Sequence, residues 1–110
     1  MNYTIGIDLG GTNTRIGLDA EDGKVIEVLK FKTYEHKELN DFVETLSDNI
    51  VLIAQKHNLP KESIKVGIGA PNGNYYAGTI EQAPNLPFKG IVPLVDLLKE
   101  SLKKKSYSAE

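Results

Sequence analysis

The residues best suited to chemistry follow the first apolar stretch of the chain. Apolar side chains alternate at Tyr3, Ile5, Ile7 and Leu9, and residues 8–15 read Asp-Leu-Gly-Gly-Thr-Asn-Thr-Arg. This order predicts a strand that ends in a carboxylate, then a tight Gly-Gly turn, then a second strand. Glycines lack a Cβ atom, so the backbone N–H groups of such a turn can approach a bound anion closely. We therefore interpret the segment as a turn that binds the phosphates of a nucleoside triphosphate.

The side chains around the two glycines support this interpretation. Thr12 and Thr14 offer hydroxyl donors, and Asp8 can hold a hydrated Mg²⁺ because hard cations prefer carboxylate and water oxygens. The alternative is a simple hairpin in which Asp8 accepts turn N–H groups. Such a hairpin does not need an Asp, two Thr and an Arg around its glycines. No Gly-Lys-Ser/Thr or Gly-x-Gly-x-x-Gly pattern is present at this turn, which disfavours the P-loop and Rossmann folds.

Length and composition are typical of a single soluble domain. The 110 residues carry a formal net charge of −2 and no cysteine. This charge gives no indication of a nucleic-acid or membrane partner, and the lack of cysteine excludes disulfides and thiolate metal sites. The first residues do not resemble a signal peptide, and no apolar run is long enough to span a membrane. We expect one domain over residues 1–110, located in the cytoplasm.

Hydrophobic periodicity predicts the elements that position the turn. Strands are expected over residues 3–9, 14–19, 24–34 and 64–68. Apolar residues spaced by three and four predict an amphipathic helix over 38–58, and a last helix is expected to begin at Pro93. Residues 72–89 are rich in turn formers, with a short hairpin through 75–80. A long helix between strands implies a crossover and at least one parallel pair, so the fold class is α/β with a mixed sheet and flanking helices.

Three blocks of sequence follow one another along the chain. They are Ile-Gly-Ile-Asp-Leu-Gly-Gly-Thr-Asn-Thr-Arg at 5–15, Gly-Ile-Gly-Ala-Pro at 67–71 and Ala-Pro-Asn-Leu at 83–86. In order and spacing they resemble the N-terminal lobe of ROK-family sugar kinases, similar to bacterial glucokinases, within the actin-like ATPase superfamily. The resemblance implies a ribonuclease H-like lobe. It also implies an ATP- and Mg²⁺-dependent hexose kinase that transfers the γ-phosphate of ATP to a sugar hydroxyl.

The same resemblance implies site residues. Those that face the ATP phosphates and Mg²⁺ are Asp8, Gly10, Gly11, Thr12, Asn13, Thr14 and Arg15, with Asp8 as the metal ligand. Those that line the sugar side of the cleft are Gly73, Asn74, Pro84 and Asn85. Two positions beside the expected sugar pocket, Asn72 and Phe88, differ from the residues usual in the family. The sequence therefore does not select one hexose.

In the family, the catalytic base is an Asp of an Asn-Asp motif on the strand after the last helix, and a second lobe supplies the adenine contacts. After the last expected helix, residues 1–110 contain no Asn-Asp pair and no second lobe, so no catalytic residue is assigned. Phosphoryl transfer depends on positioning and charge stabilisation between aligned groups. We expect this chain alone to be inactive as a kinase and to bind MgATP weakly.

Two other functions stay open, a nucleotide switch of the actin type and a sugar-sensing regulator. The family's repressors carry a helix-turn-helix before the first strand, where this chain has only two residues, so no DNA binding is expected. His57 and the lysines at 103–105 are interpreted as structural residues near helix ends. Apolar residues expected to be uncovered predict a homodimer or swapped assembly: Leu86, Phe88, Ile91 and Val92.

Overall fold

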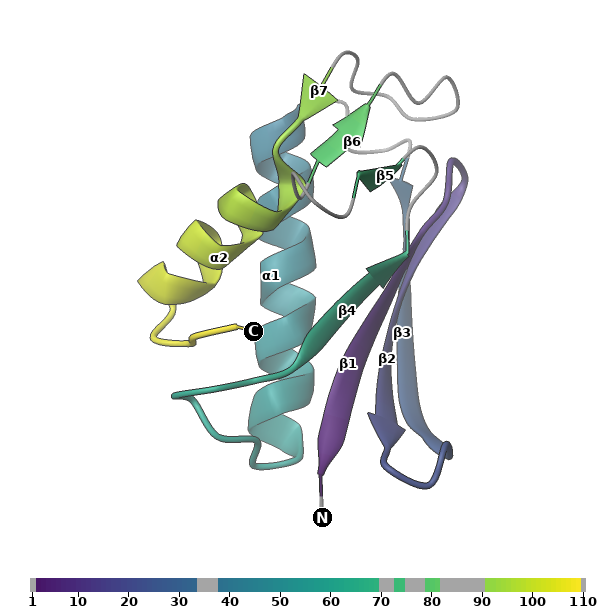
Figure 1. Ribbon diagram of the computed structural model, residues 1–110, viewed down its shortest axis with the longest axis vertical. Coiled ribbons are helices and arrows are strands. Elements are labelled where there is room, and N and C mark those ends of the chain that lie inside the picture. Colours follow the sequence, from purple (N-terminus) through teal and green to yellow (C-terminus); the bar gives the residue numbers. More distant parts are fainter. Residues whose placement is uncertain (1, 34–37, 70–72, 75–78, 82–90, 110) are drawn as a thin grey trace.

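The main sheet of the protein contains four strands in the order β3-β2-β1-β4 (Figure 1). The structure is a computed structural model that describes residues 2–33, 38–69, 73–74, 79–81 and 91–109. The strands are β1 (Tyr3–Leu9), β2 (Asn13–Ala20), β3 (Val25–Lys32) and β4 (Val66–Gly69). β1 pairs antiparallel with β2 and parallel with β4. The expected crossover and the mixed sheet are therefore confirmed.

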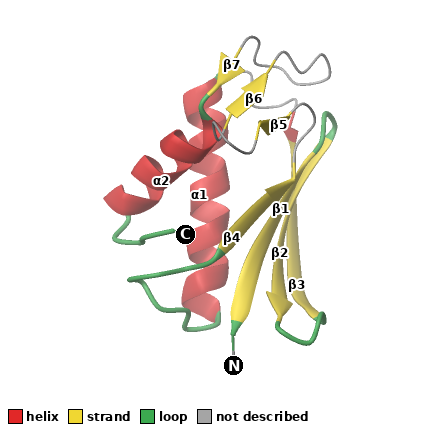
Figure 2. Cartoon of the chain, in the orientation of Figure 1, coloured by secondary structure: helices red, strands yellow, loops and turns green. Residues whose placement is uncertain are grey.

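Two helices cover one face of this sheet, as Figure 2 shows. Helix α1 spans Leu39–Lys56 and helix α2 spans Leu94–Lys104. The three- and four-residue spacing of apolar residues in α1 forms a buried stripe that packs on the sheet. Helix α2 begins at Leu94, one residue after the expected start at Pro93, which is instead the N-cap residue. In the described part of the chain, neither helix is long and apolar enough to cross a membrane.

Alternating burial along the central strands explains why the helices lie on one face only. In β1, Ile5, Ile7 and Leu9 are buried in the core, whereas Thr4 and Asp8 are exposed. Burial of each large aliphatic side chain stabilises the fold by about 1.5–3 kcal/mol. The period of two thus directs the apolar residues towards the helices and the polar residues towards the opposite, open face.

A second, three-stranded sheet follows β4 in the chain. Its strands are β5 (Gly73–Asn74), β6 (Thr79–Glu81) and β7 (Ile91–Val92), paired antiparallel in that order. A hairpin is confirmed here, but its paired residues are 73–74 and 79–80, so its first strand begins before the expected range of 75–80. β7 is not in the sequence prediction, and two residues are too short to show a periodicity.

The bounds of three strands differ from the prediction: β2 spans Asn13–Ala20 rather than 14–19, β3 spans Val25–Lys32 rather than 24–34, and β4 spans Val66–Gly69 rather than 64–68. β3 ends at Lys32 rather than at residue 34, and Thr33 follows it directly. β4 begins at Val66, because Ile64 forms an isolated parallel bridge with Ala109. These differences lie within the usual uncertainty of element boundaries predicted from sequence.

Candidate functional site

The turn between β1 and β2 is as tight as its two glycines predict. The Gly10 N–H donates to the carbonyl of Asn13 at 3.1 Å and closes the turn directly after β1. A Cβ on Gly10 would lie 2.8 Å from that carbonyl oxygen, closer than real side chains approach backbone atoms. Glycine is therefore required at this position by the close approach of the chain to itself.

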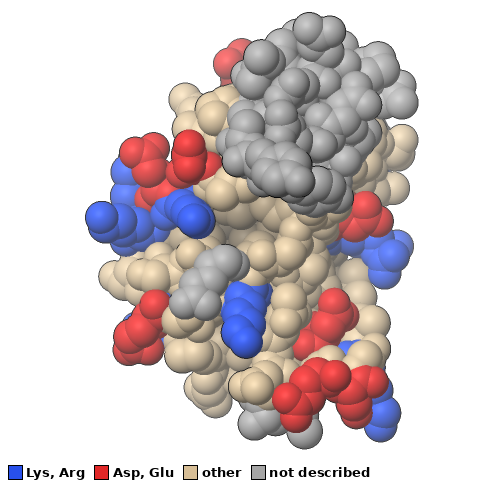
Figure 3. Space-filling view, viewed as in Figure 1, with Lys and Arg blue, Asp and Glu red and all other residues tan. Residues whose placement is uncertain are grey.

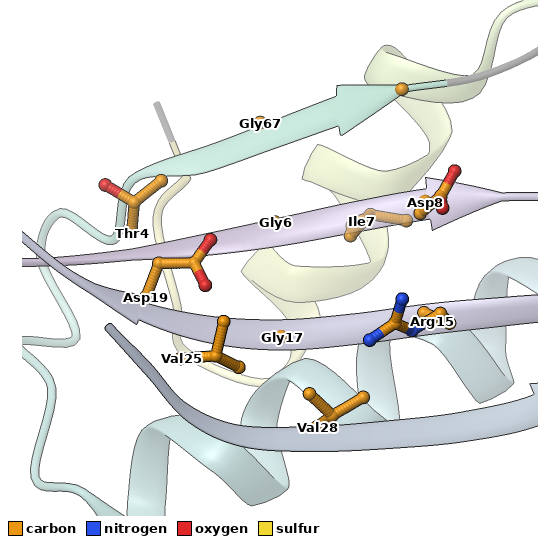
Figure 4. A pocket seen from close by; sticks show the side chains of 11 residues that line it. Thr4, Gly6, Ile7, Asp8, Arg15, Gly17, Asp19, Val25, Val28 and Gly67 are labelled. Atoms are coloured by element: carbon orange, nitrogen blue, oxygen red, sulfur yellow. The ribbon is translucent and has the colours of Figure 1, made fainter. Parts of the chain in front are cut away.

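Asp8 and Arg15 flank this turn and lie directly opposite each other on β1 and β2. Both are exposed on the open face of the sheet, where their side chains are visible in Figure 4. Asp8 is also paired in register with Gly69 at the end of β4. Within the described residues, neither charged group has an ion-pair partner.

The remaining predicted phosphate-site residues divide into two groups. Thr12 and Asn13 are exposed and Gly11 is half-buried, so these three lie at the surface of the turn. Thr14, in contrast, is fully buried, and its Oγ1 lies 2.7 Å from Oγ1 of Thr33. Its hydroxyl is engaged inside the fold, which corrects the expectation of a free donor. Thr14 supports the turn from within.

A row of glycines that the sequence reasoning missed forms the floor of a hollow beside the turn. Gly6 is paired in register with Gly17 on β2 and with Gly67 on β4. The hollow has a volume of about 460 Å³ and opens on the uncovered face of the sheet (Figure 4). Asp8 and Arg15 line it on the side of the turn. The period of two places all three glycines on the open face, so alternation along each strand could have revealed them.

The predicted sugar residues are only partly within the described structure. Gly73 and Asn74 form β5, which begins shortly after β4 ends at Gly69. Because β1 and β4 are parallel, the turn after β1 and the chain leading to β5 leave the sheet at the same edge. Open α/β sheets bind ligands at this kind of edge, outside the carboxyl ends of parallel strands. Pro84 and Asn85 lie outside the described residues.

The surface expected to drive association also lies largely outside the described part of the chain. Leu86 and Phe88 are not described, and Ile91 and Val92 are described only as the backbone of β7. The homodimer therefore stays a prediction. Sedimentation velocity over a range of concentrations tests it, and a single monomeric species at high concentration would contradict it.

The donor set at the turn fits a magnesium ion that arrives with a nucleotide. No cluster of three or more His, Cys, Asp or Glu occurs among the residues that the structure describes. Mg²⁺ commonly binds through one or two carboxylates, several waters and the substrate phosphates. A single exposed carboxylate at Asp8 matches this pattern. On the face of the molecule that Figure 3 displays, acidic and basic side chains are interspersed.

Two groups of ion pairs lie away from the turn. They shift the pKa values of Glu27, Glu44 and Lys105. Hydrogen bonds from His57 at 2.7 Å and from Lys56 at 3.0 Å lower the pKa of Glu27. These contacts join β3 to the end of α1, which supports the structural interpretation of His57. A hydrogen bond from Lys105 lowers the pKa of Glu44, and the same contact raises the pKa of Lys105. This second group joins α1 to the end of α2.

Comparisons with known proteins agree with this architecture. Residues 4–109 match the ROK family. The chain is 32% identical over 104 residues to the glucokinase of Thermotoga maritima, and the match covers 94% of this chain and 32% of that protein. The chain thus spans about a third of the length of this relative.

Solved structures show the same fold. A ROK family glucokinase from Streptomyces griseus, in complex with glucose and AMPPNP, has a TM-score of 0.74 at 22% identity, covering 98% of this chain and 32% of that one. A ROK family transcriptional regulator, a homolog of the E. coli MLC protein, has a TM-score of 0.62 at 20% identity, covering 97% of this chain and 26% of that one. At these identities the likeness establishes the fold.

Proposed function

Because the chain belongs to the ROK family, we propose that it forms the phosphate-binding lobe of an ATP-dependent hexose kinase of the glucokinase kind. In this proposal the kinase transfers the γ-phosphate of ATP to a sugar hydroxyl. Residues 1–110 supply the phosphate turn and part of the sugar pocket. The catalytic base and the adenine contacts come from polypeptide outside these residues, in keeping with the third of the relative's length that the chain spans.

The observation that carries the proposal is the exposed pair Asp8 and Arg15 beside a turn that requires glycine at position 10. An anion-binding turn needs accessible N–H groups and a nearby cation, and the residues from Gly11 to Asn13 lie at the surface. The guanidinium of Arg15 suits bidentate contact with phosphate oxygens. These features support a ligand as a further partner of the exposed side of the turn.

Asp8 would hold Mg²⁺ through its carboxylate, with waters and phosphate oxygens completing the shell. When bound, the ion neutralises charge on the phosphates during transfer. Arg15 orients the phosphate chain from the opposite strand, and the backbone of Gly11 approaches it without a side chain. Gly73 and Asn74, with Pro84 and Asn85, hold the sugar.

The second candidate is a non-catalytic module that binds nucleotide or sugar. The regulator that shares this fold favours keeping this alternative. The two candidates differ in what the completed protein does with bound sugar and ATP. A kinase consumes both, whereas a regulator or switch only changes conformation or partners.

Calorimetry of the 110-residue chain with MgADP and with glucose tests the proposal. We expect weak, magnesium-dependent binding of MgADP and a response of the backbone amides of residues 10–13 in an NMR titration. A coupled assay should show no sugar phosphorylation by this chain alone, because a base aimed at the sugar hydroxyl contributes about 10²–10⁴-fold. Absence of any MgADP response at millimolar concentration would reject the proposal.

A further inference from the structure

Thr33 contacts the phosphate turn in two ways, although it lies outside the turn in sequence. It follows β3 directly and is fully buried. Its backbone N–H donates to the carbonyl of Thr12 at 2.9 Å. Its side-chain Oγ1 lies 2.7 Å from Oγ1 of Thr14, which is also fully buried.

The backbone contact fixes the orientation of a peptide group within the turn. A trans peptide unit is planar, with its C=O and N–H pointing in opposite directions. Because Thr33 binds the Thr12 carbonyl, the following N–H, that of Asn13, points away from β3. Together with the bond from Gly10 to Asn13, this contact fixes the turn at both of its ends.

The side-chain contact makes the arrangement specific. A buried hydroxyl without a partner is costly, and here one hydroxyl donates to the other, so that each has a hydrogen-bond partner. In the described residues, no buried side-chain polar atom lacks a hydrogen-bond partner. A shift of either threonine would therefore break this pair, so the end of β3 and the start of β2 hold one register.

We propose that Thr33 is a positioning residue that preorganises the phosphate turn, a role that rests on the proposed function. Binding to a turn that is already ordered avoids the cost of ordering it when the ligand arrives. Thr33 does not touch the phosphates. It acts through Thr12 and Thr14, which explains why a residue 19 positions from Thr14 contributes to the site.

The experiment compares Thr33→Val with Thr33→Ser. Valine keeps the size of threonine and loses the hydroxyl, whereas serine keeps the hydroxyl. Ser101→Ala is a matched control, because Ser101 and Ser47 form a second buried hydroxyl pair, also at 2.7 Å, between α1 and α2. For each chain we would measure urea unfolding, amide hydrogen exchange of residues 10–13 and the Kd for MgADP.

We expect Thr33→Val and Ser101→Ala both to lower the urea midpoint, since each removes a buried hydrogen bond between two hydroxyls, and Ser101→Ala also removes the 3.3 Å bond from Ser101 to Glu44. Only Thr33→Val should accelerate amide exchange at residues 10–13 and raise the Kd for MgADP, by about fivefold. Thr33→Ser, which keeps the hydroxyl, should show wild-type amide exchange at residues 10–13 and a wild-type Kd for MgADP. If Thr33→Val folds too poorly to titrate, faster exchange at residues 10–13 in Thr14→Val, with Ser101→Ala unchanged, provides the same support.

The outcomes separate this inference from the proposed function. The positioning role would be overturned if Thr33→Val and Ser101→Ala showed the same amide exchange at residues 10–13 and the same affinity for MgADP. This holds even if the wild-type chain binds nucleotide. A wild-type chain that does not bind MgADP would reject the proposed function instead. In that case the exchange data still decide whether Thr33 orders the turn.

Discussion

Asp8 and Arg15 are cross-strand partners at the end of the sheet from which the β1–β2 turn emerges. Residues directly opposite each other on antiparallel strands are close neighbours, and opposite charges in such positions usually attract. No ion pair joins these two in the described structure, and both remain exposed. A ligand with anionic oxygens and a bound cation could therefore contact both groups at once.

The first prediction concerns these two charges. Asp8→Asn removes the carboxylate that we assign to Mg²⁺, and Arg15→Lys replaces a planar bidentate donor with a point charge. Each substitution should weaken MgADP binding by about tenfold, with little change in stability because both side chains are exposed. Isothermal titration calorimetry measures the affinity, and thermal unfolding measures the stability.

Asp19→Asn is the matched control for Asp8→Asn. Asp19 lies on β2 and lines the same hollow as Asp8, four residues along the strand from Arg15. Its replacement should leave MgADP affinity within about twofold of wild type, because it is remote from the turn. Equal losses in the two variants would indicate a general charge effect and contradict a specific role for Asp8.

The second prediction compares Gly10, in the turn after β1, with Gly67 on β4. Gly10→Ala places a Cβ 2.8 Å from the Asn13 carbonyl oxygen, and backbone atoms cannot move aside as a flexible side chain can. We expect a loss of roughly 1–3 kcal/mol in unfolding free energy and a large loss of MgADP affinity. Gly67→Ala is the control, because nothing lies within 4 Å of its added Cβ. It should be neutral or stabilising by about 0.4–1 kcal/mol.

Urea denaturation of the two alanine variants makes this comparison. A Gly10→Ala chain as stable as Gly67→Ala would show that the turn can relax. The requirement for glycine at position 10 would then be withdrawn, together with the close approach of the chain on which it depends.

The third prediction is a loss of stability in acid that depends on Glu27. Contacts from His57 and Lys56 lower its pKa below the ordinary value of 4.5 in the folded chain. A lowered folded pKa stabilises the protein above the unfolded pKa, and this contribution is lost as pH falls through the folded value. Glu27→Gln should therefore be less stable than wild type at pH 7, and the difference should shrink below pH 4.5.

Urea midpoints measured between pH 3 and pH 7 test this expectation. Glu21→Gln is the control, since Glu21 is exposed beyond the end of β2 and no ion pair in the described structure includes it. A constant difference between Glu27→Gln and wild type across this range would show that the contact does not depend on the charge of Glu27.

The sequence predicts features that depend on neighbouring residues within one strand or helix. It does not predict contacts between residues that are distant in the chain. The alternation from Tyr3 to Leu9 predicts β1 at its observed bounds, and the spacing of apolar residues predicts α1 to within a few residues. The same alternation, continued through β2, places Thr14 with Ile16 and Leu18 on the buried face. The alternation therefore predicts that Thr14 is buried, whereas its hydroxyl suggested a contact with a ligand instead.

The alternation of residues along a strand does not predict the hydrogen-bond partner of Thr14. Thr33 meets Thr14 only because β2 and β3 pair in one register, and an irregularity between Leu18 and Asp19 shifts that register. Single-sequence periodicity indicates which face a residue occupies, but not which residue lies across from it. The support of the turn by Thr33 therefore required the structure.

The last prediction concerns the alkaline limit of stability, which depends on the junction of the two helices. The ammonium of Lys105 pairs with Glu44 and lies 3.6 Å from the carboxylate of Asp48, so its pKa is raised above the ordinary 10.5. A raised pKa in the folded state stabilises the protein below the unfolded pKa, and this contribution is lost as pH rises through the folded value. Lys105→Met should lower the urea midpoint at pH 8, and its deficit relative to wild type should diminish above pH 10.5.

Lys104→Met is the control, because Lys104 is exposed at the same helix end without a direct ion pair in the described structure. A deficit as large for Lys104→Met as for Lys105→Met would assign the effect to the helix dipole rather than to the contact with Glu44.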